Sequence, residues 1–77
     1  MNREEFIKSV NANRLANKGS WWGWTGSIGN HEVRIKAYGT WVQRLQAGPG
    51  KFNDSGPAEC SVKVFKEYLA SIYDHLA

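Results

Sequence analysis

The stretch that decides the fold reads HEVRIKAY and runs from His31 to Tyr38. Its apolar residues Val33, Ile35 and Ala37 alternate with polar or aromatic ones. Successive side chains of a strand point to opposite faces, so this alternation predicts a strand with one buried and one exposed face. The exposed face would carry Glu32, Arg34, Lys36 and Tyr38.

A second predicted strand, Ser20 to Gly26, holds three of the four tryptophans of the chain. Alternation places Trp22 and Trp24 on one face and Trp21 on the other. A one-layer sheet in a chain of 77 residues has one face that can be fully covered, so we expect at least one of these indoles to be exposed. A large exposed aromatic side chain is typical of a contact surface. Residues 27–30, Ser-Ile-Gly-Asn, predict the turn into the central strand.

The third predicted strand runs from Thr40 to Gln46, after a tight return at Gly39. We place Trp41 and Leu45 on its inner face, because the opposite choice would bury Arg44. Together the three strands predict an antiparallel meander.

Residues 47–59 are rich in glycine, proline and small polar residues, which predicts a long, flexible surface loop. Within this segment, Lys51-Phe52 either supplies a short fourth strand or pins the loop by burying Phe52.

Helices are predicted at both ends of the chain. The first begins at Asn2, which forms a capping box with Glu5, and stops near Lys18-Gly19. The second begins after Ser61, and its apolar residues recur at intervals of three and four. They are Val62, Phe65, Leu69, Ile72 and Leu76. This apolar stripe is expected to pack on the buried face of the central strand, which gives one α+β domain spanning residues 1–77.

Composition argues against several classes of function. The single cysteine, Cys60, allows no internal disulfide, and we expect it to be a small buried residue. No motif pairs it with His31, which we expect to be exposed, or with His75, which we place in the last helical turn. We therefore expect no catalysis, no cofactor and no metal site. No apolar stretch approaches the roughly 20 residues of a membrane span, and the first residues lack the apolar block of a secretory signal, so a cytoplasmic protein is expected.

The expected binding residues are aromatic and cationic: Trp21, Trp24, Arg34, Lys36, Tyr38 and Arg44. This mixture is typical of protein-binding hot spots and also of single-stranded nucleic-acid binders. The net charge of +3 is spread along the chain, which favours nucleic acid only weakly. Three alternatives stay open. The first is a weak single-stranded nucleic-acid binder that uses the same face, and the second is a homodimer that buries its indoles. The third is a fold in which the N-terminal helix covers this face and the clustered tryptophans are core.

One segment resembles parts of short uncharacterised proteins that bacteriophages encode. It runs from Glu32 to Gln43, with Cys60-Ser61-Val62-Lys63 opening a helix after a variable loop. The chain is also similar in size to the small phage proteins that block host machinery, anti-CRISPR proteins among them. The resemblance implies a phage or prophage source and an inhibitor that acts by binding, and it identifies no target. Our first hypothesis is that the chain binds a host protein complex, of the kind that handles nucleic acids in defence, as a monomer or homodimer in the bacterial cytoplasm.

Overall fold

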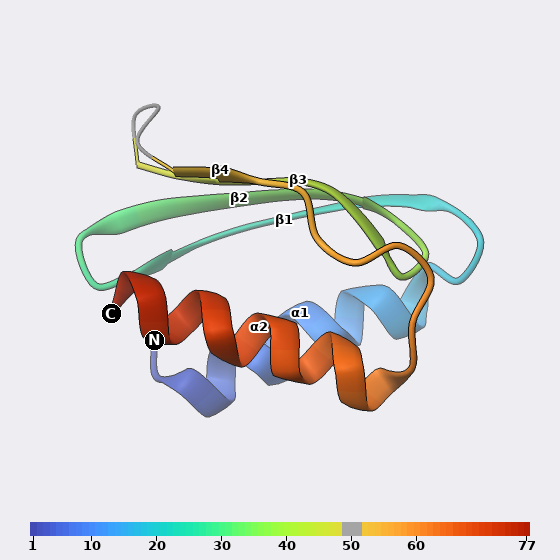
Figure 1. Cartoon of the computed structure of the whole chain (residues 1–77), viewed down its shortest axis with the longest axis horizontal. Coiled ribbons are helices and arrows are strands. Elements are labelled where there is room, and N and C mark those ends of the chain that lie inside the picture. The colour runs from blue at the N-terminus through green and yellow to red at the C-terminus, as the bar shows by residue number, and fades with distance from the viewer. Residues whose placement is uncertain (49–51) are drawn as a thin grey trace.

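In the computed structural model, the described residues form a four-stranded antiparallel sheet over a layer of two helices (Figure 1). The structure describes residues 1–48 and 52–77, and of residues 52 and 53 the backbone alone. The elements follow the chain as α1 (Arg3–Ala16), β1 (Trp21–Ile28), β2 (His31–Tyr38), β3 (Trp41–Ala47), β4 (Phe52–Asp54) and α2 (Val62–Leu76). The predicted α+β fold, with a helix at each end of an antiparallel meander, is confirmed.

The N-terminal helix begins and ends close to its predicted limits. The Oδ1 atom of Asn2 accepts a hydrogen bond of 2.8 Å from the backbone N–H of Glu5, whose own carboxylate accepts from the backbone N–H of Asn2. This reciprocal pair is the predicted capping box, and it satisfies donors that the first helical turn leaves free. The helix ends at Ala16, and Gly19 then adopts a positive φ of 73° that glycine tolerates at no steric cost.

Two-residue turns connect the first three strands. Each turn begins with a glycine of positive φ, 58° at Gly29 and 55° at Gly39. In such a hairpin the residues on either side of the turn pair directly, as Tyr38 does with Trp41. The tighter first turn corrects one prediction, because Ile28 belongs to β1 and is fully buried instead of lying in the turn.

A β-bulge in β3 overturns the predicted orientation of Trp41. The register of β3 against β2 shifts between Val42 and Arg44, which leaves Gln43 as an extra residue. Consequently Val42 and Leu45 are both fully buried, while Arg44 is exposed. Leu45 therefore lies inward as predicted, but Trp41 lies outward with 43% of its surface exposed. The prediction assumed strict alternation along the strand, and the extra residue breaks it.

The segment after residue 51 adds a short strand to the sheet edge and then crosses back toward α2. β4 pairs antiparallel with β3, which is the fourth strand that the sequence left as one option. Lys51 lies outside the described residues. Further on, the backbone N–H of Gly56 donates to the carbonyl of Val42 at 2.9 Å. A Cβ atom at Gly56 would lie 2.8 Å from both Val42 and the Tyr68 ring, so this connection packs closely against the sheet and α2.

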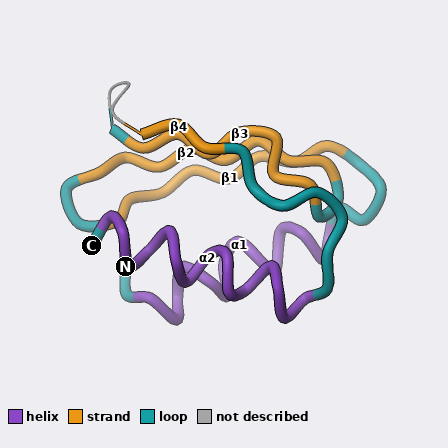
Figure 2. Tube along the Cα trace, in the orientation of Figure 1, coloured by secondary structure: helices purple, strands orange, loops and turns teal. Residues whose placement is uncertain are grey.

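Both helices lie on the same side of the sheet, as Figure 2 shows. α2 is capped by Ser61 and buries Phe65, Leu69, Ile72 and Leu76 of the predicted stripe, whereas Val62 is 40% exposed. From α1, Phe6 and Val10 enter the same core. The inner face of the sheet contributes Trp22, Trp24, Ile28, Val33, Ile35, Ala37, Val42, Leu45 and Ala47. No described helix covers the opposite face, so the alternative with α1 across that face is wrong.

Candidate docking surface

The side of the sheet that faces away from both helices is here called the outer face. It displays every second residue of β1 and β2, because the inner residues of these strands alternate with exposed ones. Its most distinctive feature is a line of aromatic side chains across three strands. Trp21 pairs with Tyr38, and Tyr38 pairs in turn with Trp41.

These three residues form what we call the aromatic row. The exposed fractions of Trp21, Tyr38 and Trp41 are 52%, 41% and 43%. The Trp21 ring meets the Tyr38 ring edge-on, with centroids 5.2 Å apart and planes at 70°, and its centroid lies 6.4 Å from that of Trp41. Edge-on aromatic pairs contribute about 0.5–1.5 kcal/mol beyond their area burial. The row is therefore an ordered surface feature whose rings support one another while still facing solvent.

Two cations lie next to the aromatic row. Lys36 and Arg44 pair across β2 and β3, one same-face position away from Tyr38. The Nζ atom of Lys36 lies 5.3 Å from the centroid of the Trp21 ring, a distance at which a cation is attracted to the face of an aromatic ring. On β1, the partner of Lys36 is Gly23, so no side chain projects from this position next to Trp21. The aromatic row and these two cations together form the candidate docking surface.

Arg34 also lies on the outer face, but its charge is offset. Its Nη2 atom forms an ion pair of 3.0 Å with Oε1 of Glu32, and both side chains are about two-thirds exposed. An ion pair so exposed contributes little to stability, about 0–1 kcal/mol. It does reduce the positive potential at this end of the face. Among the described residues of the outer face, the net positive charge near the aromatic row thus comes from Lys36 and Arg44.

Trp24 is the one member of the predicted binding set that the structure places elsewhere. It lies on the inner face with 7% of its surface exposed. Its Nε1 atom donates to the Ser9 hydroxyl at 2.8 Å, and its ring meets the Phe6 ring edge-on at 5.3 Å. Trp22 is similarly buried and donates to the carbonyl of Gly39 at 2.8 Å. Both inner indoles therefore act as core side chains, with their N–H groups satisfied.

Trp41 is the member of the aromatic row that was not among the predicted binding residues. The sequence held a signal that could have found it. A two-residue turn of Gly39 and Thr40 makes Tyr38 and Trp41 direct partners, and direct partners share a face. Tyr38 was placed outward from its own strand, so the hairpin alone would have placed Trp41 beside it.

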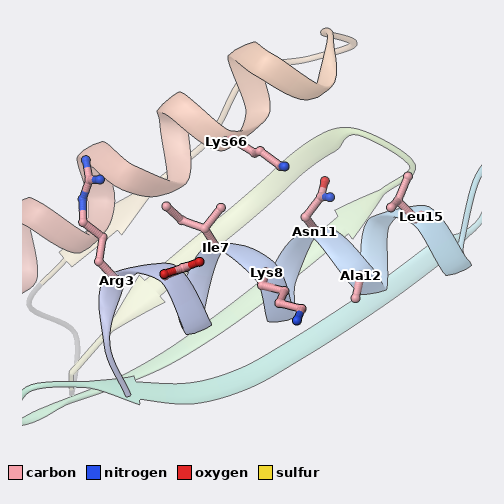
Figure 3. Close-up of a pocket in the computed structure, with 8 residues that line it drawn as sticks. Arg3, Ile7, Lys8, Asn11, Ala12, Leu15 and Lys66 are labelled. Carbon is pink, nitrogen blue, oxygen red and sulfur yellow. The ribbon is translucent and has the colours of Figure 1, made fainter.

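A groove on the helical layer is a separate surface, shown in Figure 3. Most of its lining comes from α1, and Lys66 of α2 faces it from the opposite wall. Inside it, Asn11 is 9% exposed and its Oδ1 atom has no hydrogen-bond partner. None of the residues that line the groove is aromatic, and its large exposed apolar side chain is Leu15. The outer face, with its three exposed rings, is the stronger candidate for recognition.

Cys60 and the pair of Tyr68 and Asp54 carry groups that can take part in chemistry. Cys60, which was predicted to be buried, is half-buried and packs against the core. Burial raises the pKa of the Tyr68 hydroxyl, as do the negative charge of Asp54 and the hydrogen bond of 3.2 Å to its carboxylate. That hydrogen bond connects α2 to the end of β4, so Tyr68 and Asp54 have a structural role.

Within the described ranges, no cluster of three or more His, Cys, Asp or Glu side chains is placed to bind a metal ion. No described helix has the length and apolar character needed to cross a membrane. Protein-family models, curated proteins and solved structures were all compared with the chain, and none of them matches it.

Proposed function

We propose that this chain is a non-enzymatic binding protein whose outer face docks on an acidic, partly apolar surface of a protein partner. The observation that carries the proposal is the aromatic row, in which three neighbouring strands each expose one large ring beside Lys36 and Arg44. Trp, Tyr and Arg are the residues most enriched in binding hot spots. Trp and Tyr bury a large area with few rotatable bonds to order.

The resemblance to phage-encoded proteins supports a host protein complex as the partner. In that setting the chain acts in the bacterial cytoplasm as an inhibitor. It obstructs a nucleic-acid-handling defence complex by occupying a surface that the complex needs, and no chemical step is required of it.

The test is affinity capture from a bacterial host lysate with matched variants as bait. The face variant combines Trp21→Ala, Lys36→Ala and Arg44→Ala, all at exposed positions. The control combines Leu15→Ala with Lys8→Ala and Lys66→Ala, which removes one apolar side chain and two cations from the helical groove. We expect wild type and control to retain the same partner, and the face variant to lose it.

Circular dichroism of both variants checks that the fold is intact before capture is compared. Equal capture by the face variant would reject the outer face as the docking surface. Sedimentation velocity of the wild type adds a second check. A dimer that dissociates on Trp21→Ala would show that the row binds a second copy of the chain instead.

Single-stranded nucleic acid is a second candidate, because sheets that display rings among cations also bind stacked bases. Two observations weigh against it. The first is that the Trp21 ring meets its neighbour edge-on and has Lys36 over its face. The second is that the described part of this face has two cations without an ion pair, Lys36 and Arg44, which offer few phosphate contacts. Titration with an oligonucleotide at low salt decides the question. Quenching of tryptophan fluorescence that weakens steeply with added salt would favour nucleic acid over a protein partner.

A further inference from the structure

A pocket of about 590 Å³ opens at the end of the sheet, next to the aromatic row. Tyr38 and Trp41 belong to both the pocket and the row. The other walls come from the last turn of α1, the turn between β2 and β3, and the residues that precede α2. Its charged lining residues are Arg14, Lys18 and Glu59. We call it the Arg14 pocket, because Arg14 is its unusual member.

Arg14 is a buried cation without a counter-ion. It is 8% exposed, and its Nε atom is buried with no hydrogen-bond partner. The ion pairs found among the described residues are Arg3–Asp74 and Arg34–Glu32, and neither includes it. Buried charges in proteins are normally paired and hydrogen-bonded, because removing a charge from water is costly. An exception that lines a pocket indicates that the missing partner comes from outside the chain.

The two interactions that hold the Arg14 side chain in place do not use the N–H donors of its guanidinium. The central carbon of its guanidinium lies 5.3 Å from the centroid of the fully buried Phe65 ring. Its position in the last turn of α1 also suits a cation, because the helix dipole is negative there. Neither interaction accepts an N–H hydrogen from the guanidinium. The side chain is thus oriented by its surroundings but not satisfied by them.

We propose that the Arg14 pocket binds a carboxylate group presented by an acidic residue of the protein partner. A guanidinium offers N–H donors in a planar fork, and a carboxylate offers two oxygens that match it. Lys18 adds a second positive charge at the rim. With Glu59 on the same rim, the charged lining residues sum to a net charge of +1, which a singly charged carboxylate neutralises and a doubly charged phosphate exceeds.

This inference rests on the proposed function for the source of the carboxylate, which the partner supplies. It extends that function by naming what the partner presents: an acidic side chain next to the apolar group that covers Trp41 and Tyr38. The anion site itself is testable without any partner, so its failure is distinguishable from a failure of the docking proposal.

The test is NMR titration of the isotope-labelled full chain with sodium acetate at constant ionic strength, with sodium chloride as the reference salt. The signals followed are the Nε–H of Arg14 and the indole N–H of Trp41. We expect acetate to shift both in a saturable way, with a dissociation constant on the order of millimolar, because so small a ligand has few atoms to contribute. Chloride should leave them nearly unchanged.

Two variants that each remove one positive charge show which side chain binds acetate. Arg14→Gln should weaken acetate binding at least tenfold, whereas Lys18→Gln, an exposed cation on the same rim, should weaken it less than threefold. Glu59→Gln should strengthen it. Because Arg14→Gln removes a buried side chain, its spectrum is first checked for the native fold, and the wild-type Nε–H shift stands as an independent readout.

Three results would overturn the proposal. The first is an acetate response no larger than that of chloride. The second is an equal loss of binding in Lys18→Gln and Arg14→Gln, since diffuse charge would then explain the effect. The third is inorganic phosphate binding tenfold more tightly than acetate in a parallel titration, which would assign the pocket to phosphate.

Discussion

Replacing Gly26 with alanine tests the packing of the core against the docking surface. Gly26 follows Trp24 on the inner face of β1, and a Cβ atom there would lie 2.4 Å from Cη2 and 2.7 Å from Cζ2 of the Trp24 ring. Ordinary contacts of a Cβ atom begin near 3.4 Å, so the ring would have to move by about 1 Å. It is held by its hydrogen bond to Ser9 and by Phe6, so such a shift also strains those contacts.

Gly23 on the same strand supplies a matched control, because it lies on the outer face. A Cβ atom at Gly23 would meet the Ile35 carbonyl at 3.5 Å, which is an ordinary contact. Forcing an extra carbon into a packed core costs about 1–3 kcal/mol, whereas glycine to alanine at an unstrained site stabilises by about 0.4–1 kcal/mol. We therefore expect Gly26→Ala to be less stable than Gly23→Ala by about 1.5–4 kcal/mol.

Urea unfolding followed by far-ultraviolet circular dichroism measures this difference without relying on the indole that is disturbed. In a Trp24→Phe background, Gly26→Ala should lower the free energy of unfolding by less than half as much as it does in the wild type. The smaller phenyl ring frees the space that the new methyl group needs. If the two alanine variants unfold at the same urea concentration, the Trp24 ring does not occupy the space over Gly26. The assignment of Trp24 to the core would then fail.

Four further substitutions test other parts of the structure. Trp24→Ala should cost about 3–5 kcal/mol and the half-exposed Trp21→Ala at most about 2, so equal shifts in thermal unfolding would contradict the assigned faces. Asn11→Leu should stabilise the protein by about 1–2 kcal/mol in urea, because it removes a buried acceptor without a partner, and destabilisation would mean that this oxygen is used. Burial raises the pKa of Tyr68 above the value of 10.0 of a free tyrosine, so the stability from its neutral hydroxyl is complete below about pH 10 and falls as pH rises further. Tyr68→Phe should flatten that fall, and an unchanged pH profile of urea midpoints would argue against the hydrogen bond to Asp54.

Local chemistry made the main elements predictable. The central strand has the predicted limits of His31 and Tyr38, because the buried apolar residues Val33, Ile35 and Ala37 alternate with exposed polar or aromatic ones. The capping residues Asn2 and Ser61 begin their helices as expected, since their side chains satisfy backbone donors within the same turn. These features depend on residues a few positions apart, so the sequence carries them directly.

The predicted binding set was correct in placing Trp21, Arg34, Lys36, Tyr38 and Arg44 on the exposed face, but its partner-binding role stays a prediction. It was wrong about Trp24 and missed Trp41. Each error has the same kind of cause, because a residue of one strand was assigned without reference to its neighbour. Trp24 fits the core through the space that Gly26 leaves, and Trp41 turns outward with its hairpin partner.

From the sequence alone it followed that the chain forms an antiparallel meander between two helices and that at least one clustered indole faces solvent. Alternation of side chains along a strand is a local property, and it separates Trp21 from Trp22 and Trp24 whatever the rest of the chain does. The sequence also predicted that the C-terminal helix covers the apolar face of the central strand. Only the tertiary structure decided which face α1 covers, because that choice depends on α1 packing beside α2 beneath the sheet. The same packing buries Arg14 against Phe65 at the edge of the aromatic row, a juxtaposition of residues 51 positions apart that no local pattern could reveal.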